Sequence, residues 1–340
     1  MSHVHRSLVR AAALAAVLVM LTAAPAAADP AGPGDFRSEV TGIVPAVDGI
    51  AATITGGDSF LELEVDPGHV VVVEGYSGEP YLQVLEDGTV QRNRLSRATY
   101  LNDDRKGRVD IPVEVLAAID AGADPEWETV ADGGAYAWHD HRVHWMADAS
   151  PPVARGERVT GAYDPWRVPI EVDGRRVEIQ GTLTYASASS PLPWVGLALA
   201  SALGLAWLGR RQGLRTAAMA LLVVALAAVV VGRADWAATP DGDGNPLLWA
   251  LPLLALVAAV GAAALATKSS GVLLALASVA ALSGWALFRV EALLKPVLPT
   301  TLPFALDRAT LALALGVSAA VAYLAVTSGV LSLPDLEDDQ

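Results

Sequence analysis

Five uncharged apolar stretches after Pro191 constrain the fold of this chain more than any other feature. They cover about 191–209, 216–232, 247–267, 271–288 and 309–333. A helix rises about 1.5 Å per residue, so the length of each stretch falls within the range of about 17 to 25 residues that crosses a hydrocarbon core about 30 Å thick. The sequence therefore predicts an α-helical membrane bundle of five spans over 191–333, in contact with the lipid bilayer. An acidic tail, 334–340, follows the last span.

The first 28 residues have the pattern of a secretory signal peptide. Arg6 and Arg10 precede an apolar run over 11–23, and an A-x-A site, 26–28, comes just before Asp29. The apolar run is about 13 residues long, which is short for a membrane-spanning helix. We expect cleavage after residue 28, with an uncleaved anchor as the alternative.

Export of the next region, 29–190, sets the predicted orientation of the bundle. Counting crossings from outside puts the arginine-containing loop 210–215 in the cytoplasm, as the positive-inside rule requires. The predicted location is the cell membrane, multi-pass, with an extracytoplasmic N-terminal domain and a cytoplasmic C-terminus. Three prolines between 296 and 303 interrupt an apolar external segment, which we expect on the membrane or under the exported domain. The five predicted cores contain no ionisable residue, which argues against an ion pump.

The exported domain is strongly acidic and the chain contains no cysteine. Residues 29–190 include 28 acidic and 13 basic side chains, a difference of -15. This charge disfavours nucleic acid as a partner and favours cations. The lack of cysteine excludes disulfides and thiolate metal sites, so the domain depends on a hydrophobic core.

Period-two alternation in the same region predicts β-strands. Leu61, Leu63 and Val65 alternate with glutamates, and two alternating runs, 168–172 and 177–185, flank an Asp173-Gly174 turn. We expect further strands near 42–54, 70–73, 81–85, 127–130 and 135–139, and one helical turn near 113–119. About eight short strands predict an all-β exported domain, an antiparallel sandwich of immunoglobulin-like architecture.

One nonapeptide, 138–146 (WHDHRVHWM), holds three of the six histidines of the chain. Alternate side chains of a strand share a face about 7 Å apart, so His139 and His141 could reach one metal ion. Imidazoles suit copper or zinc, and the thioether of Met146 would favour Cu(I). The segment therefore predicts a transition metal site with His139 and His141 as its first ligands.

Strand parity complicates a larger ligand set. His144 and Met146 share the opposite face from His139 and His141 unless the chain bends near Arg142. A two-histidine site completed by His69 or by a carboxylate is an equal alternative. The histidines could instead form hydrogen bonds and pack on a tryptophan-rich strand, or act together as a pH sensor below about pH 6.5.

Several segments resemble a group of uncharacterised actinobacterial membrane proteins. They are 75–82 (GYSGEPYL), 98–102 (ATYLN), the nonapeptide, and 166–169 (WRVP) through 181–184 (GTLT). The resemblance covers the exported domain, and it covers the spans only in number and character. It implies export and membrane attachment, and it implies no particular activity.

The function expected from the sequence is that of a membrane-anchored extracytoplasmic binding or accessory protein that handles copper or another transition metal. No Walker loop, dinucleotide fingerprint or zinc-protease helix is present in the sequence. One alternative is a structural or interaction module that contacts a protein partner in the cell envelope. A second is an extracellular hydrolase that uses Asp or Glu with a histidine.

Overall fold

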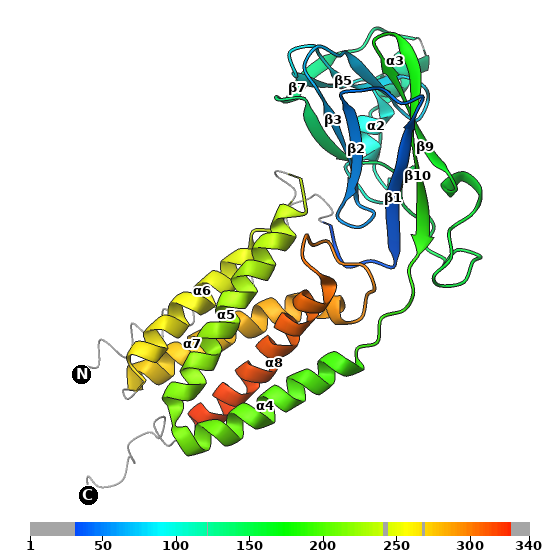
Figure 1. Ribbon diagram of the computed structural model, residues 1–340. Helices are drawn as coiled ribbons and strands as arrows, with labels where there is room; N and C mark the ends of the chain where they lie inside the picture. The colour runs from blue at the N-terminus through cyan, green and yellow to red at the C-terminus, as the bar shows by residue number, and fades with distance from the viewer. Residues whose placement is uncertain (1–30, 121, 241–243, 267–268, 328–340) are drawn as a thin grey trace, which may run out of the picture.

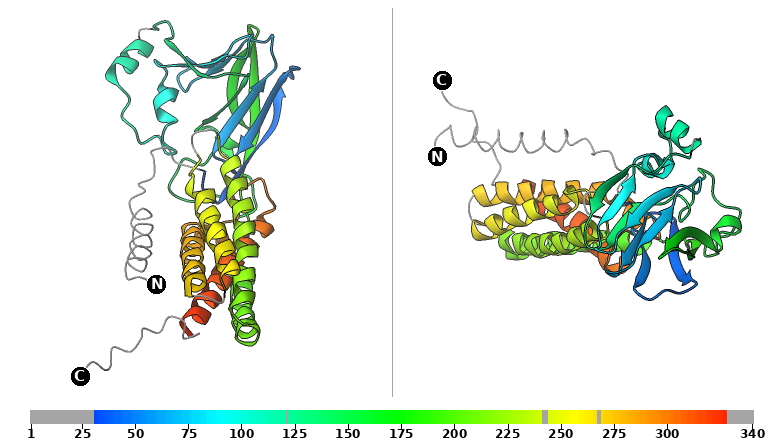
Figure 2. Two further views of the ribbon diagram at one scale, coloured as in Figure 1. Left: turned by 90° about the vertical axis from the view of Figure 1, so that its left-hand side faces the viewer. Right: turned by 90° about the horizontal axis from the view of Figure 1, so that it is seen from above.

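The computed structural model describes residues 31–120, 122–240, 244–266 and 269–327. The predicted signal peptide (1–28) and acidic tail (334–340) lie outside the described residues. A β domain is followed by a bundle of long helices, and Figures 1 and 2 show the domain at one end of the bundle. The β domain contains, in chain order, β1 (Phe36–Val44), β2 (Ile50–Thr55), β3 (Phe60–Val65), β4 (Val71–Glu74), β5 (Pro80–Val84), β6 (Val90–Asn93), α2 (Arg97–Leu101), α3 (Val113–Asp120), β7 (Trp127–Ala131), β8 (Ala135–His139), η1 (Gly161–Tyr163), β9 (Trp166–Val172) and β10 (Arg175–Tyr185).

The strands form two sheets in which every paired neighbour is antiparallel. One sheet has seven strands in the order β1-β10-β9-β4-β5-β6-β7, and the other has three in the order β2-β3-β8. Leu61 and Leu63 of the small sheet share one apolar core with Val73, Ile170 and Ile179 of the large sheet. The predicted strands at 61–65, 70–73 and 168–185 are confirmed, whereas the single strand expected near 42–54 is two strands. The immunoglobulin-like sandwich stays a prediction.

Five helices of the bundle are long and apolar enough to cross a membrane, in agreement with the predicted number. They are α4 (Leu192–Gln212), α5 (Leu214–Ala237), α6 (Leu247–Ala264), α7 (Ser269–Phe288) and α8 (Phe304–Thr327), with a short η2 (Val290–Leu293) after α7. Small residues let helices approach closely: a side chain at Gly316 of α8 would collide with the backbone of α4 at Ala198. The chain is therefore a multi-pass membrane protein in its architecture.

Two helix boundaries, the end of α5 and the start of α8, differ from the predicted apolar stretches in a way that matters. Helix α5 continues past residue 232 to include Asp235, and α8 starts early enough to include Asp307 and Arg308. All three side chains are buried. A span predicted from hydropathy ends where charged residues begin. Here the helices continue through the charged residues, whose side chains face the protein interior.

The β domain is joined to the bundle by the linker between them and by contacts with the segment before α8. Strand β10 leads into α4 through the linker 186–191. Far away in sequence, Gly34 and Val297 exchange both backbone hydrogen bonds, at 2.9 and 3.1 Å, and Lys295 Nζ lies 2.6 Å from Asp35 Oδ2. The proline-containing segment before α8 therefore lies under the β domain, which confirms one of its two predicted positions.

Candidate functional site

The nonapeptide leaves the sheet at His139, where β8 ends, and turns sharply. Asp140 is fully buried and organises this turn. Its carboxylate accepts hydrogen bonds from the Trp138 indole at 2.8 Å and from the backbone and guanidinium of Arg142 at 2.7 to 3.0 Å. Desolvation raises the pKa of Asp140, but the charge of Arg142 and the hydrogen bonds from Arg142 and Trp138 together outweigh it and hold this pKa below its ordinary value. The bend on which a three-histidine cluster depends is therefore built by Asp140 and Arg142.

The bend brings three histidine rings together. The ring centroids of His139 and His144 lie 4.9 Å apart, those of His141 and His144 5.5 Å, and those of His139 and His141 6.2 Å. A tetrahedral three-histidine site, with metal to nitrogen bonds of about 2.0 Å, would place ring centroids about 5 Å apart. Extended-strand parity thus fails at residue 140, and His144 joins the two histidines that were expected to face away from it.

The ring nitrogens differ in what they contact. Nε2 of His139 and Nε2 of His144 are buried without a hydrogen-bond partner. Nδ1 of His144 is 3.4 Å from the Trp145 carbonyl oxygen, and Nε2 of His141 is 2.9 Å from that of Asp104. Among the described residues, no group of three or more histidine, aspartate or glutamate side chains could hold a metal ion as it stands.

Burial keeps these histidines neutral. Desolvation, followed by the positive charge of Arg105, lowers the pKa of His139 to about 3 and that of His144 to about 2. Desolvation also lowers the pKa of His141, against the favourable contact with Asp104. At neutral pH the rings are uncharged, and neutral imidazole is the form that coordinates metal ions.

Two cations from the loop after α2 border the cluster. Arg105 donates to Asp58 Oδ1 at 2.7 Å and to Ser59 Oγ at 3.1 Å, so its charge is partly balanced by a buried carboxyl group. Lys106 Nζ lies 3.2 to 3.4 Å from three successive carbonyl oxygens, those of residues 145–147. These bonds fix the chain that follows His144, and the sequence pattern gave no indication of either cation.

Of the remaining predicted ligands, His69 is placed elsewhere. Phe60 at the start of β3 pairs with His139, whereas His69 follows the far end of that strand. Its Nδ1 lies 2.8 Å from Asp173 Oδ2 in the β9–β10 turn. The structure therefore does not bring His69 to the cluster. Met146 follows the cluster directly and accepts a hydrogen bond from Lys106 through its carbonyl oxygen, and its thioether as a ligand stays a prediction.

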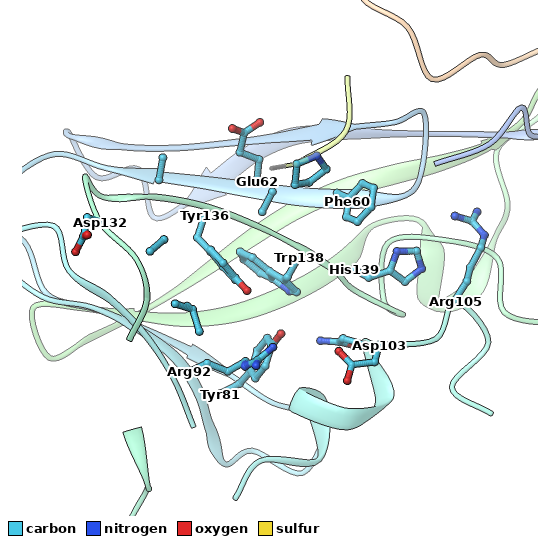
Figure 3. Close-up of a pocket in the computed structure, with 16 residues that line it drawn as sticks. Phe60, Glu62, Tyr81, Arg92, Asp103, Arg105, Asp132, Tyr136, Trp138 and His139 are labelled. Carbon is cyan, nitrogen blue, oxygen red and sulfur yellow. The ribbon is translucent and has the colours of Figure 1, made fainter. Parts of the chain in front are cut away.

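The cluster borders a cavity of about 730 Å³. His139 and Arg105 lie at one end of it, as Figure 3 shows, with Asp103 close by and Tyr136 and Trp138 further along the wall. The cavity also includes Pro240, from the connection after α5. A volume of this size suits a small molecule, and His139 is the histidine of the cluster that such a molecule would meet first.

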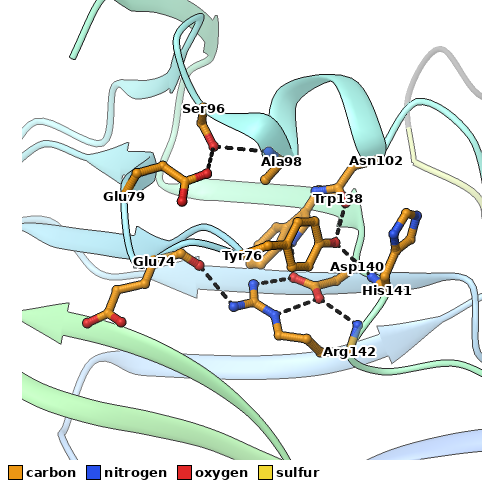
Figure 4. A network of polar contacts seen from close by, with 10 residues as sticks. All are labelled: Glu74, Tyr76, Glu79, Ser96, Ala98, Asn102, Trp138, Asp140, His141 and Arg142. Atoms are coloured by element: carbon orange, nitrogen blue, oxygen red, sulfur yellow. Dashed lines mark hydrogen bonds and ion pairs between the residues drawn. The ribbon is translucent and has the colours of Figure 1, made fainter. Parts of the chain in front are cut away.

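A hydrogen-bond network around Tyr76 contacts the cluster at His141 (Figure 4). The Tyr76 hydroxyl contacts Asn102 and accepts a hydrogen bond from the backbone N–H of His141 at 2.9 Å. The rings of Tyr76 and His141 stack, with their centroids 5.5 Å apart. Glu79 accepts from Ser96, the N-cap residue of α2, at 2.7 Å. Segment 75–82 therefore positions α2 and His141.

Comparison with known proteins does not assign the chain to a family. No family model matches it, and neither the curated proteins nor the solved structures include a match.

Proposed function

We propose that the chain is a membrane-anchored binding protein whose β domain takes up a transition metal ion, copper or zinc, at His139, His141 and His144. The observation that carries this proposal is the pair of buried Nε2 atoms without partners on rings 4.9 Å apart, beside a third imidazole. A buried polar atom without a partner costs about 1 to 3 kcal/mol, and a metal ion bound to both nitrogens would remove that cost.

Metal uptake requires a small local change. Either His141 turns Nδ1 toward the metal and keeps the bond from Nε2 to the Asp104 carbonyl, or Nε2 binds the metal and that hydrogen bond, worth about 1 kcal/mol, is lost. Three imidazoles without thiolate suit Cu(II) or Zn(II), and addition of the Met146 thioether would shift the preference to Cu(I). The fourth position would open toward the cavity, since His139 lies in its wall.

Arg105 favours a second candidate function, the binding of a small anion. Its guanidinium faces both His139 and His144 and lies in the wall of the same cavity as His139. A positive charge there opposes a metal cation and attracts an oxyanion. Neutral imidazole also carries one N–H donor, so the ring nitrogens can serve either ligand. The two candidates therefore predict opposite effects of removing the Arg105 charge.

Titration of the purified full-length protein in detergent tests both candidates. We expect Cu(I), Cu(II) or Zn(II) to bind more tightly than about 10 μM, roughly -7 kcal/mol, and the His139→Ala, His144→Ala double variant to lose that affinity. His69→Ala is the matched control and should bind as the parent does. Affinity weaker than this limit for all three ions, or an unchanged double variant, would remove the metal proposal.

The paired variant Arg105→Gln, Asp58→Asn separates the candidates, because it removes both partners of a buried ion pair and leaves neither charge behind. Metal affinity should rise in this variant. If the anion alternative is correct, inorganic phosphate binds the parent protein but does not bind this paired variant.

We also propose that the β domain, an immunoglobulin-like sandwich, is extracytoplasmic and that the C-terminus is cytoplasmic. The pattern of the first 28 residues and the arginines of loop 210–215 support this orientation. A reporter active only in the cytoplasm, fused to the C-terminus, should be active. An inactive fusion, together with an active periplasmic-type reporter at the same position, would reverse the orientation. An envelope protein partner or a hydrolase activity remains the alternative if neither metal nor phosphate binds.

A further inference from the structure

Two carboxyl groups and one guanidinium lie buried at the end of the bundle that faces the β domain. Asp235 is near the end of α5, Arg289 directly follows α7, and Asp307 is in the first turn of α8. Their residues are 2%, 6% and 0% exposed. Ionisable groups buried among membrane helices are costly, so a cluster of this kind calls for a functional explanation.

The geometry of the cluster is that of a carboxyl pair on one donor. The same nitrogen, Nη2 of Arg289, binds Oδ2 of Asp235 and Oδ2 of Asp307, the latter at 2.8 Å. The other oxygen of each carboxyl group, Oδ1, and Nη1 of Arg289 are buried without a hydrogen-bond partner. The guanidinium carbon lies 4.9 Å from the centroid of the Trp285 ring, and Thr300 also approaches Asp235. The two carboxyl groups are therefore neighbours in a site with little access to water.

Other charged groups near the cluster have different partners. Arg308, the residue after Asp307, donates to the carbonyl oxygens of Ala292, Lys295 and Pro296. Its charge acts on Asp307 through space, but its hydrogen bonds go to the backbone. Among the described residues, the other charged groups at this end of the bundle are Arg233, which lies over the Trp236 ring, exposed Glu291, and Lys295, which pairs with Asp35. Among the described contacts, Arg289 is thus the one cation hydrogen-bonded to both carboxyl groups.

We propose that Asp235 and Asp307 form a proton-binding site in which the two carboxyl groups share one proton at neutral pH. Adjacent carboxylates resist ionising together, because each charge raises the free energy of the other. One proton leaves a single negative charge, which Arg289 balances. It also gives the carboxyl pair an O–H donor, which can serve one of the oxygen atoms that now lacks a partner.

The position of the site gives the proton a structural consequence. The site lies below the segment that links α7 to α8, and Arg308 holds that segment by its carbonyl groups. The same segment carries Lys295 and Val297, which contact the β domain. Loss of the proton adds a buried negative charge directly beneath this contact.

Infrared spectroscopy of the full-length protein in lipid nanodiscs tests the proposal. At pH 7.5 we expect the carbonyl stretching band of a neutral carboxylic acid, which one of the single variants, Asp235→Asn or Asp307→Asn, removes. The Asp58→Asn control should keep this band, because Asp58 forms an ion pair with Arg105 in the β domain and we expect it to be ionised. A band that survives in both single variants would overturn the proposal.

Thermal unfolding in detergent gives a second, independent result. An amide resembles a neutral carboxyl group, so one single variant should melt with the parent. The double variant leaves Arg289 without a carboxylate and should melt lower. Equal destabilisation by both single variants, with no acid band in the parent spectrum, would show two ionised groups. Stability that rises with sodium or potassium concentration, without the acid band, would show a metal cation in place of the proton. Either result defeats the proposal.

Discussion

Mild acid should destabilise the β domain through its buried histidines. The perturbation is a change from pH 7.5 to pH 5.0 in metal-free buffer. The pKa values of His139 and His144 are lowered from 6.5 to about 3 and about 2 in the folded protein. Between those values and 6.5 the unfolded chain binds protons that the folded chain does not, so stability is complete above pH 6.5 and falls as the pH drops.

The size of the effect follows from the unfolded state. At pH 5 the solution is about 1.5 units below the unfolded pKa, and one unit corresponds to about 1.36 kcal/mol. Each of the two histidines therefore costs about 2 kcal/mol at pH 5, about 4 kcal/mol together. This free-energy value requires only that the pKa values of both histidines in the folded protein stay well below 5. Asp58 and Asp103, whose pKa values burial raises, act in the opposite direction.

Hydrogen exchange measured by mass spectrometry on full-length protein provides the assay, because peptides from β3, β8 and β9 report the opening of the β domain apart from the bundle. The comparison is between the parent and the His139→Gln, His144→Gln variant, so that contributions of carboxyl groups cancel. The parent should lose about 4 kcal/mol more than the variant between the two pH values. His69→Gln, a change at an exposed ion pair, should behave as the parent. The same pH dependence in parent and double variant would refute the reasoning.

Three further results are expected. Asp140→Ala should lower the free energy of unfolding by about 3 to 5 kcal/mol in thermal or exchange measurements, because it leaves Arg142 without its carboxylate partner. Asp148→Ala, which removes one partner of an exposed pair, should lower it by less than about 1 kcal/mol. Similar losses in the two variants would contradict the assigned role of Asp140. The double variant Gly34→Cys, Val297→Cys should form an intramolecular disulfide on mild oxidation, seen as a mobility shift on non-reducing gels. The reason is that the Cα atoms of paired residues in an antiparallel bridge lie about 4.5 to 5.5 Å apart. Formation of disulfide-linked dimers alone would contradict the contact. Gly181→Ala should destabilise the β domain strongly in the same exchange assay, because its methyl group would collide with the tryptophan ring of β9; normal protection of β9 and β10 would contradict this.

Elements with strong periodic or hydropathy patterns could be predicted from the sequence. The five apolar helices and the β9–β10 hairpin fall in this class, because lipid contact and one-sided burial impose regular patterns on the chain. Strand β6 and helix α2 were missed. Strand β6 reads Val-Gln-Arg-Asn and presents no alternating apolar face, and α2 is a five-residue helix stabilised by its N-cap, Ser96.

The candidate site was predicted in its residue types and only partly in its geometry. The density of histidines in the nonapeptide located the cluster. Its shape depends on Asp140, whose carboxylate binds Arg142 and Trp138, and a period-two pattern contains no information about such side-chain bonds. Arg105 comes from a loop more than thirty residues earlier in the chain, so its approach to His139 depends on tertiary packing. The buried charges of the bundle could not be predicted for a related reason. Asp235, Arg289 and Asp307 lie on three different segments of the chain and become partners only in the folded protein.

The two connections between the β domain and the bundle restrict how the domain can move. A domain held by a single flexible linker can sweep through a wide range of tilts. Here the linker 186–191 provides one point of attachment, and the contact of Gly34 and Asp35 with Val297 and Lys295 provides another. Arg37 of β1, which lies over the Phe304 ring of α8, adds a further contact between the same two parts. While these contacts hold, the β domain would tilt together with the bundle, and a molecule that reaches the histidine cluster would meet it in one orientation relative to the membrane helices.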